Sequence, residues 1–268
     1  MIMVSNFHTH TTFCDGKNTP EEVVICSIEK GFECIGFSGH GYTGFDLTYC
    51  VKDMQKYVFE INRLKEKYKN KIQIYLGVEE DAFNPLCHED FDYVIGSSHY
   101  LCAQGKYYPI DLDCVSFKNC LKIFDNDIIK LAEAYYCTFC EYILKTKPDI
   151  IGHFDLITKF DEADNLGFLC NEEYNRIAEK YITEALKSEA VFEVNTGAIS
   201  RGLRSTPYPA ENLLYTLKKH GGKVMLSSDS HSIQTLDFYF DEAKQLLRDI
   251  GFECVYGIYD GEWKKYWL

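Results

Sequence analysis

The chain has 268 residues, of which 46% are hydrophobic, and a formal net charge of -13. This length and composition allow a sizeable buried core, and no linker-like or strongly charged block divides the sequence, which favours one domain over residues 1–268. The negative charge opposes a broad nucleic-acid-binding surface, because contact with many phosphates requires a basic stripe. A small phosphorylated substrate is still compatible if local cations or metal ions attract it.

Neither a membrane span nor a secretion signal is indicated. No stretch approaches the roughly 18 consecutive apolar residues of a membrane helix, and the first residues lack a basic region followed by an apolar run. The twelve cysteines are dispersed along the chain, so we expect reduced thiols and a cytoplasmic protein. The C-x-x-C pair of Cys137 and Cys140 lies in a helical pattern without a second pair at zinc-site spacing, and we assign it to core packing.

The first predicted strand, from Met1 to Phe7, leads directly into His8 and His10. Side chains alternate between the faces of a strand, so these two histidines project from the same face, as paired metal ligands do. For an isolated H-x-H pair, structural histidines at a loop edge are an equally good interpretation. The remaining histidines must decide between the two.

A second unit of the same kind follows. The sequence predicts a helix over about 19–31, since Thr19 is suited to the N-cap and a proline occupies the first helical position. A buried strand at 34–38 then ends at His40, which stands between two glycines. A tight turn there would expose the imidazole, which favours a metal-ligand role for His40 over a structural role in the loop.

The third unit ends in three carboxylates. A long helix is expected over about 48–69, followed by an apolar strand at 72–81. Alternation puts Glu79 and Asp81 on one side of this strand and Glu80 on the other. A solvated acidic loop is the ordinary explanation, and the position at a strand end is what makes Glu79 a ligand candidate.

The next two predicted strands also run into histidines. The strand at 91–97 precedes His99, and a short strand before a glycine precedes His153. Between these strands, the pattern predicts helix over about 112–146 with a break near 125–127.

The last part of the chain continues the alternation. A strand at 190–195 places Glu193 and Asn195 on one face, and the loop after it contains Arg201 and Arg204. Helices are also expected at 171–189, 209–220 and 235–250, strands at 223–227 and 253–259, and an aromatic tail on the barrel exterior at 261–268. Asp229 and His231 follow the strand at 223–227 and share one face.

This succession of strand, loop and helix units predicts a parallel sheet which, at seven or eight units, closes into a barrel. In such barrels the loops after the strands converge on one end, so polar side chains far apart in sequence can meet there. Six of the eight histidines follow strands, which leaves His88 and His220 as ordinary ones. The candidate ligands are His8, His10, Asp15, His40, Glu79, His99, His153, Asp229 and His231.

Six imidazoles with three or more carboxylates exceed the needs of a single zinc ion, which takes about four ligands. We therefore expect two or three divalent metal ions, with zinc, iron or manganese favoured by nitrogen and oxygen ligands. A bridging carboxylate and a bridging hydroxide would hold the ions roughly 3.5 to 4 Å apart, which suits in-line displacement at phosphorus. The hydroxide would attack while the metals neutralise the phosphoryl oxygens.

These residues resemble the polymerase and histidinol phosphatase (PHP) superfamily over nearly the whole chain. The matching elements are His8-Thr9-His10 with Asp15, Gly39-His40, Gly77-Val78-Glu79, Ser97-Ser98-His99, Gly152-His153, Phe192-Glu193-Val194-Asn195 and Ser228-Asp229-Ser230-His231. The resemblance implies a distorted (β/α)7 barrel with three metal sites at the carboxyl end of the strands, with Glu79 bridging two metals and the ligand set holding the hydroxide. It assigns His8, His10, Glu79 and Asp229 to one ion, Glu79, His99 and His153 to a second, and Asp15, His40 and His231 to a third.

Within the superfamily, the segment from Glu193 to Gly197 followed by Arg201 is most similar to members that hydrolyse L-histidinol phosphate in histidine biosynthesis. That resemblance implies a small phosphate monoester as substrate, gripped by Arg201, with Lys159 at a position where relatives tend to carry a basic residue. For Arg204, phosphate contact and a solvated loop are equally good interpretations. The leaving alkoxide needs a proton, and both a metal-bound water and Asp155 are open as its donor.

Two other functions stay open from the sequence. One is a PHP phosphoesterase acting on nucleotides or nucleic-acid ends, which would need a basic or aromatic channel that the charge balance does not support. The other is a non-catalytic metal-binding module, against which the complete ligand set argues. The sequence does not indicate an oligomeric state.

Overall fold

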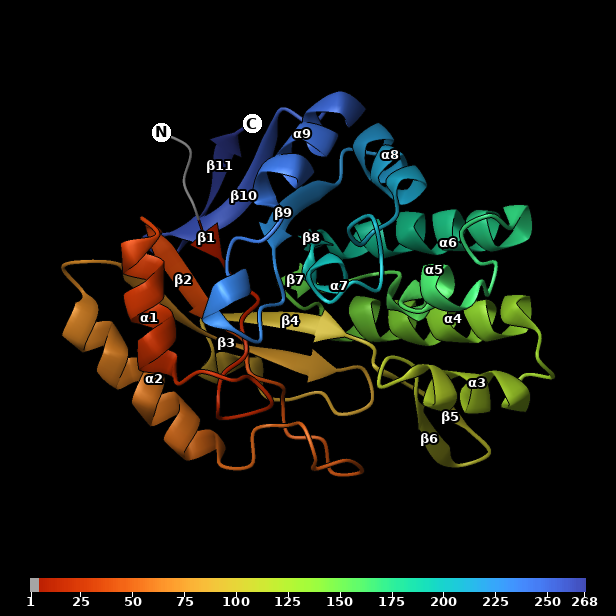
Figure 1. The fold of residues 1–268 in the computed structure, drawn as a ribbon, viewed down its shortest axis with the longest axis horizontal. Helices are drawn as coiled ribbons and strands as arrows, with labels where there is room; N and C mark the ends of the chain where they lie inside the picture. The colour runs from red at the N-terminus through yellow and green to blue at the C-terminus, as the bar shows by residue number, and fades with distance from the viewer. Residues whose placement is uncertain (1–4) are drawn as a thin grey trace.

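The computed structural model describes residues 5–268, and a seven-stranded parallel sheet forms its centre (Figure 1). The sheet curls into a nearly closed ring, as predicted, and an isolated parallel bridge between Thr9 and Ser230 joins its two edges. The start of the first expected strand, residues 1–4, lies outside the described part. In spatial order the strands are β1 (Ser5–Asn6), β2 (Cys34–Phe37), β3 (Gln73–Asp81), β4 (Tyr93–Ser97), β7 (Ile150–Ile151), β8 (Val191–Asn195) and β9 (Lys223–Ser227).

Helices cover the outer face of the ring in two groups, which lie at opposite sides in Figure 1. The first two helices pack against β2 and β3 through an apolar cluster that includes Phe37 and Leu64. The longer helices of the second half share a larger cluster around Phe139 and Phe192. The helices are α1 (Pro20–Glu29), α2 (Met54–Tyr68), α3 (Cys114–Ile123), α4 (Ile128–Thr146), α5 (Asp161–Asp164), α6 (Glu172–Ala185), α7 (Gly197–Ser200), α8 (Glu211–Lys219) and α9 (Phe240–Ile250).

Capping side chains set several helix boundaries. Thr19 and Glu22 form the expected capping box at the start of α1. Asp127 accepts backbone N–H groups at the start of α4, which confirms the predicted break between α3 and α4. The expected helix start near residue 48 is wrong, because Asp53 caps α2 and residues 48–53 remain a loop.

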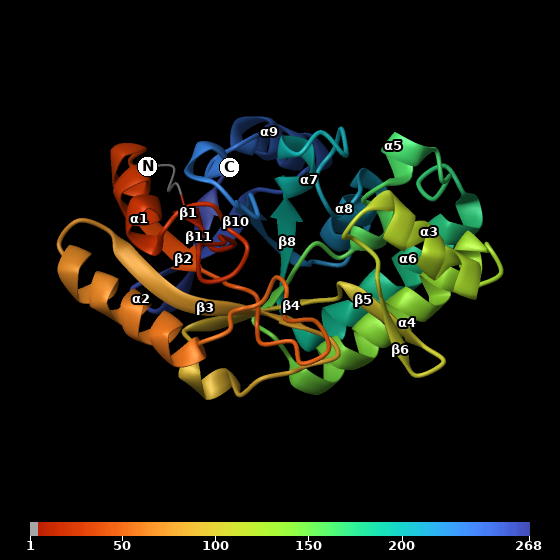
Figure 2. The ribbon, with the colours of Figure 1, turned by 60° about the horizontal axis from the view of Figure 1, so that its bottom comes forward.

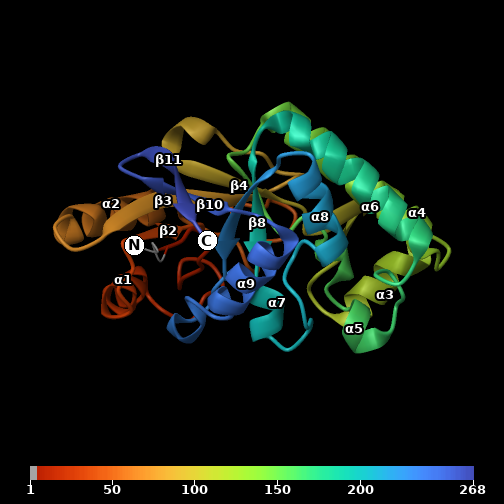
Figure 3. The ribbon, with the colours of Figure 1, turned by 90° about the horizontal axis from the view of Figure 1, so that it is seen from above.

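Two antiparallel hairpins lie outside the ring. The first, β5 (Tyr100–Ala103) with β6 (Lys106–Pro109), was not predicted. The second pairs β10 (Cys254–Tyr259) with β11 (Glu262–Trp267) and lies near the C-terminus in Figure 3. The strand expected at 253–259 therefore exists but does not join the barrel, and the expected exterior tail is a strand.

The C-terminal hairpin packs against the inner apolar cluster of the ring. Ile258 is a buried member of this cluster, and Tyr266 packs on it. The ring residues of the cluster include Cys34 and Val191, which are the first residues of their strands. The hairpin therefore covers the amino end of the ring and leaves the carboxyl end for the polar side chains.

The interior of the ring is shaped by β3 and β4. Tyr93 crosses it and donates a hydrogen bond of 2.6 Å to the carbonyl of Phe7. A Cβ at Gly77 would lie 2.2 Å from Cζ of Tyr93, so the tyrosine ring requires glycine there. As predicted, alternation along β3 directs Glu79 inward and Glu80 to the other side, where Tyr142 of α4 donates a hydrogen bond to it.

The remaining expectations concern cysteines and membrane spans. None of the twelve cysteines forms a disulfide. Cys140 is buried in the core and Cys137 packs against the same cluster, which confirms their predicted packing role. Within residues 5–268, no helix has the length and apolar character that crossing a membrane demands.

Candidate active site

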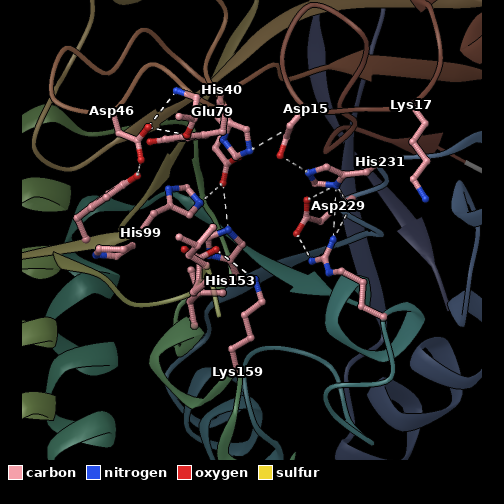
Figure 4. Close-up of a pocket in the computed structure, with 18 residues that line it drawn as sticks. Asp15, Lys17, His40, Asp46, Glu79, His99, His153, Lys159, Asp229 and His231 are labelled. Atoms are coloured by element: carbon pink, nitrogen blue, oxygen red, sulfur yellow. Dashed lines mark hydrogen bonds and ion pairs between the residues drawn. The ribbon is translucent and has the colours of Figure 1, made fainter. Parts of the chain in front are cut away.

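A cleft of about 400 Å³ opens at the carboxyl end of the parallel strands (Figure 4). Its walls include seven of the nine expected metal ligands, and the two others, His8 and His10, are buried beside them. The structure therefore brings all nine expected ligands together: His8, His10, Asp15, His40, Glu79, His99, His153, Asp229 and His231.

Five imidazoles surround the buried carboxylate of Glu79. From Oε2, the distances are 3.1 Å to His8 Nε2, 3.5 Å to His10 Nε2 and 2.9 Å to His40 Nδ1; from Oε1, they are 3.3 Å to His99 Nε2 and 3.0 Å to His153 Nε2. Burial disfavours the charged form of Glu79, but these histidines outweigh it and hold the pKa of the carboxyl well below its usual value. One ionised carboxylate thus faces two groups of imidazoles through its two oxygens.

Two further carboxylates complete the cluster. Asp229 Oδ1 lies 3.2 Å from His10 Nε2 and 3.6 Å from His8 Nε2. Asp15 Oδ2 lies 3.2 Å from His231 Nε2, and Asp15 Oδ1 lies 3.6 Å from His40 Nε2. Asp15, with a side chain 37% exposed, is the most open of these groups.

The donor atoms at the centre fit divalent metal ions. His8 Nε2, His10 Nε2 and Glu79 Oε2 are buried and have no hydrogen-bond partner, although buried polar atoms are usually satisfied. Burial, together with His231 and His40, lowers the pKa of His10 to about 3, so its imidazole is neutral and keeps a lone pair. Converging imidazole nitrogens and carboxylate oxygens are the ligands that zinc, iron and manganese take.

A carboxylate outside the cluster orients the imidazole of His8. Glu193 Oε1 lies 2.5 Å from His8 Nδ1. We assign the proton of this ring to Nδ1, which directs the Nε2 lone pair toward Glu79. Burial disfavours a charged Glu193, but His8 outweighs it and lowers the pKa of the carboxyl. Asp81 accepts the backbone N–H of His99 at 2.9 Å and so fixes the chain there. Glu193 was not assigned this role from the sequence, although the inward alternation of β8 was the available signal.

A tight loop places Asp15. The amide groups of Cys14 and Gly16 both donate to the carbonyl of Thr11, which folds the chain back on itself. A Cβ at Gly16 would lie 2.4 Å from the carbonyl carbon of His10, so the loop requires glycine there. The next amide, of Lys17, donates to the carbonyl of His231, which fixes this loop against the segment after β9.

Two of the three expected phosphate-binding residues line the cleft. Arg201 Nη2 lies 2.8 Å from Asp229 Oδ2, and the arginine side chain is 32% exposed. Lys159 Nζ donates to the carbonyl of Asp111 at 2.7 Å and lies 3.2 Å from its carboxylate.

Arg204 and Asp155 do not line the cleft. The guanidinium of Arg204 is buried, donates to Thr158 Oγ1 at 2.6 Å and lies 3.4 Å from Asp155 Oδ2. The same Asp155 oxygen accepts the amide of Ala210 at 3.0 Å. Both side chains therefore belong to this buried network rather than to the wall of the cleft.

Several cleft residues were not found from the sequence. Asp46, Tyr49, Tyr100 and Asp111 line the cleft. The first two lie in the loop after β2 and the others in or directly after the β5–β6 hairpin, both of which can be followed in Figure 2. These segments follow no recognisable motif, and the position of Asp46 shortly after His40 was the one available signal.

Comparisons with known proteins agree with this geometry. The PHP domain family model matches residues 6–197. A protein of Schizosaccharomyces pombe named "Probable histidinol-phosphatase" is 27% identical over 269 residues, covering 91% of this chain and 86% of that protein.

Two crystal structures share the fold. A candidate histidinol phosphatase of Listeria monocytogenes superposes with a TM-score of 0.76 at 22% identity, covering 89% of this chain and 99% of that one. Histidinol phosphate phosphatase of Lactococcus lactis, in complex with zinc, L-histidinol and phosphate, superposes with a TM-score of 0.65 at 22% identity, covering 97% and 98%. Because the family model spans most of its residues, this chain belongs to the PHP domain family.

Proposed function

We propose that this chain is a metal-dependent phosphomonoesterase that hydrolyses L-histidinol phosphate to L-histidinol and phosphate, as a cytoplasmic enzyme of histidine biosynthesis. The observation that carries the proposal is the Glu79 carboxylate amid five imidazoles, in a cleft that Arg201 also lines. The name of the S. pombe relative and the ligands in the L. lactis structure support the choice of substrate. The absence of disulfides among the described cysteines agrees with a reducing compartment.

The proposed ligand sets follow the clusters in the structure. His8, His10, Glu79 and Asp229 would hold one ion, Glu79, His99 and His153 a second, and Asp15, His40 and His231 a third. When bound, two or three ions of zinc, iron or manganese supply Lewis-acid stabilisation of the phosphoryl charge and activation of water. Glu79 has one oxygen toward each of the first two sets, which suits a bridging role.

The phosphate group would be held by Arg201 and Lys159. The planar guanidinium of Arg201 can donate to two phosphoryl oxygens, and its Nη1 makes two long contacts, of 3.4 Å to the Asp229 carbonyl and 3.5 Å to His231 Nδ1. Lys159 offers a point charge without that bidentate geometry. Arg201 therefore sets the orientation of the phosphate, and Lys159 adds attraction.

The leaving alkoxide requires a proton. Asp155 is turned toward Ala210 and Arg204 behind the cleft wall, so it does not reach the substrate. We therefore assign proton donation to water in the cleft, which is the other donor that the sequence left open.

The test is a substrate panel with metal-loaded protein. We expect protein loaded with zinc, manganese or iron to release phosphate from L-histidinol phosphate far faster than from nucleoside monophosphates or sugar phosphates. Equal turnover of all esters would refute the substrate assignment, and a preference for nucleotides would support a nucleotide phosphoesterase instead. Failure of the protein to bind any of these metals would refute the metal site itself.

A further inference from the structure

One side of the cleft is built by two segments outside the ring. In Figure 4, Asp46 lies on one side of Glu79 and His40, whereas Asp15 and His231 lie on the other. Arg201 belongs to the second side, because its Nη1 is 3.5 Å from His231 Nδ1. Arg201, one of the two proposed phosphate ligands, is therefore separated from Asp46 by the candidate metal centre.

The carboxylate of Asp46 is held by hydrogen bonds rather than by a cation in the described part of the chain. Its Oδ1 accepts the N–H and O–H of Thr48 at 2.9 and 2.6 Å, and its Oδ2 accepts the O–H of Tyr100 at 2.7 Å. Within residues 5–268, no lysine, arginine or histidine forms an ion pair with it. Burial opposes its charge, but these hydrogen bonds outweigh burial and lower the pKa of the carboxyl, so it is ionised at neutral pH.

The other carboxylates of the cleft differ from Asp46 in this respect. Asp111 is paired with Lys159, and its charge is compensated. The remaining three belong to the candidate metal-ligand set. Among the residues that line the cleft, Asp46 is therefore the carboxylate that is neither paired with a cation nor assigned to the metal-ligand set.

Aromatic rings stand beside this carboxylate. The ring of Tyr49 contacts the imidazole of His40 edge-on, with centroids 4.8 Å apart, and lies 6.2 Å from the ring of Tyr100. Phe45 stacks on Tyr107 of the β5–β6 hairpin at 3.9 Å, which fixes the loop against the hairpin. Aromatic faces attract cations, so the rings and the carboxylate favour the same kind of ligand.

We propose that Asp46, flanked by Tyr49 and Tyr100, binds the positively charged part of the leaving group and selects cationic phosphate monoesters. This inference rests on the proposed function, since L-histidinol phosphate carries an ammonium group and an imidazole. An ester with an anionic phosphate and a cationic leaving group matches a cleft with Arg201 on one side and Asp46 on the other.

The experiment compares wild type and Asp46→Asn on four esters. These are L-histidinol phosphate, phosphoethanolamine with an ammonium only, imidazolylpropyl phosphate with the ring only, and glycerol phosphate with neither group. For histidinol phosphate we expect about a tenfold loss of kcat/KM, mainly through KM, which corresponds to about 1.4 kcal/mol. The turnover of glycerol phosphate should change less than about twofold, because its leaving group makes no ion pair. Between the two single-group esters, the one that loses more identifies the group that Asp46 binds.

Two variants control for charge and for fold. Glu66→Gln removes the same charge from an exposed site on α2, where the side chain is 79% exposed, and should leave the preference unchanged. Tyr100→Phe removes a hydrogen bond to Asp46 but keeps the charge, so most of the preference should persist.

The outcomes separate this inference from the proposed function. If wild type does not favour histidinol phosphate over nucleotides and sugar phosphates, the proposed function fails. If wild type favours it and Asp46→Asn keeps the same preference over glycerol phosphate, the inference about Asp46 is wrong while the function stands. An equal loss on all four esters would also overturn it, because a selective role cannot affect a neutral leaving group.

Discussion

Glu193→Gln tests whether the carboxylate behind His8 controls metal binding. Glu193 is fully buried and accepts four hydrogen bonds. Its Oε1 accepts from His8 Nδ1 and the hydroxyl of Ser227, and its Oε2 accepts from the amide of His153 at 2.7 Å and from Asn195 Nδ2 at 2.9 Å. Glutamine keeps the shape, but it replaces one of these two acceptors with a donor.

Either orientation of the new amide has a cost. If its NH2 faces the second pair, it meets the backbone N–H of His153, which leaves a buried donor unsatisfied at about 1 to 3 kcal/mol. If its NH2 faces His8 instead, the imidazole must accept at Nδ1 and carry its proton on Nε2. The lone pair directed at Glu79 is then lost, and we expect a 10- to 100-fold loss of zinc affinity.

The assay is competition for zinc with a chelator of known affinity, combined with thermal unfolding. Glu80→Gln is the matched control, since Glu80 is equally buried on β3 but accepts from Leu86 and His88, away from the cleft. It should lower stability by a similar or smaller amount and leave zinc affinity unchanged. Unchanged zinc affinity in Glu193→Gln, or an equal loss in Glu80→Gln, would refute the reasoning.

Three other predictions follow from the site. Glu79→Gln should lower kcat/KM for histidinol phosphate at least about 1000-fold, or about 4 kcal/mol, because it removes the charge shared by two ligand sets; metal analysis and phosphate release would show it, and activity above a tenth of wild type would contradict it. Arg201→Ala should raise KM at least about tenfold with little change in melting temperature. Arg204→Ala should lower the free energy of unfolding by about 3 kcal/mol, since it leaves the buried carboxylate of Asp155 unpaired, while KM stays near wild type. A stable Arg204→Ala with raised KM, together with a destabilised Arg201→Ala with normal KM, would contradict the roles given to these two arginines. Removal of metal by a chelator should abolish turnover and lower the melting temperature, and added zinc, manganese or iron should restore both; turnover that survives complete metal removal would count against the mechanism.

The ring, and the convergence of the nine candidate ligands at its carboxyl end, were predictable because both depend on local regularities. In a parallel barrel, a polar side chain directly after an apolar strand lies at the carboxyl end of the barrel. His99 and His153 could therefore be placed without knowing the conformation of the loops. Period-two alternation correctly separated Glu79 from Glu80 in the same way.

The missed features depend on contacts between distant segments. The strands of the β5–β6 hairpin have only four residues each, and the hairpin packs on Phe45, which comes from another loop. The sequence at 254–259 predicts a strand like those of the ring, but this strand pairs with β11 and lies at the amino end of the ring. Arg201 and Arg204 lie three residues apart in one loop, and only the buried carboxylate of Asp155 distinguishes their roles.

Closure of the ring joins the segments that follow its first and last strands. β1 and β9 lie at opposite ends of the sheet order, and the bridge between Thr9 and Ser230 lies within the two ligand segments. The amide of His10 donates to the carbonyl of Ser230 at 2.8 Å, and the amide of Ser230 donates to the carbonyl of His8 at 3.1 Å.

A cation held by His8, His10 and Asp229 would therefore connect the first and last strands of the barrel. Loading of metal and closure of the ring are then thermodynamically linked. We expect the amides of His10 and Ser230 to exchange with solvent deuterium faster once metal is removed, before the helical side around α4 and α6 opens.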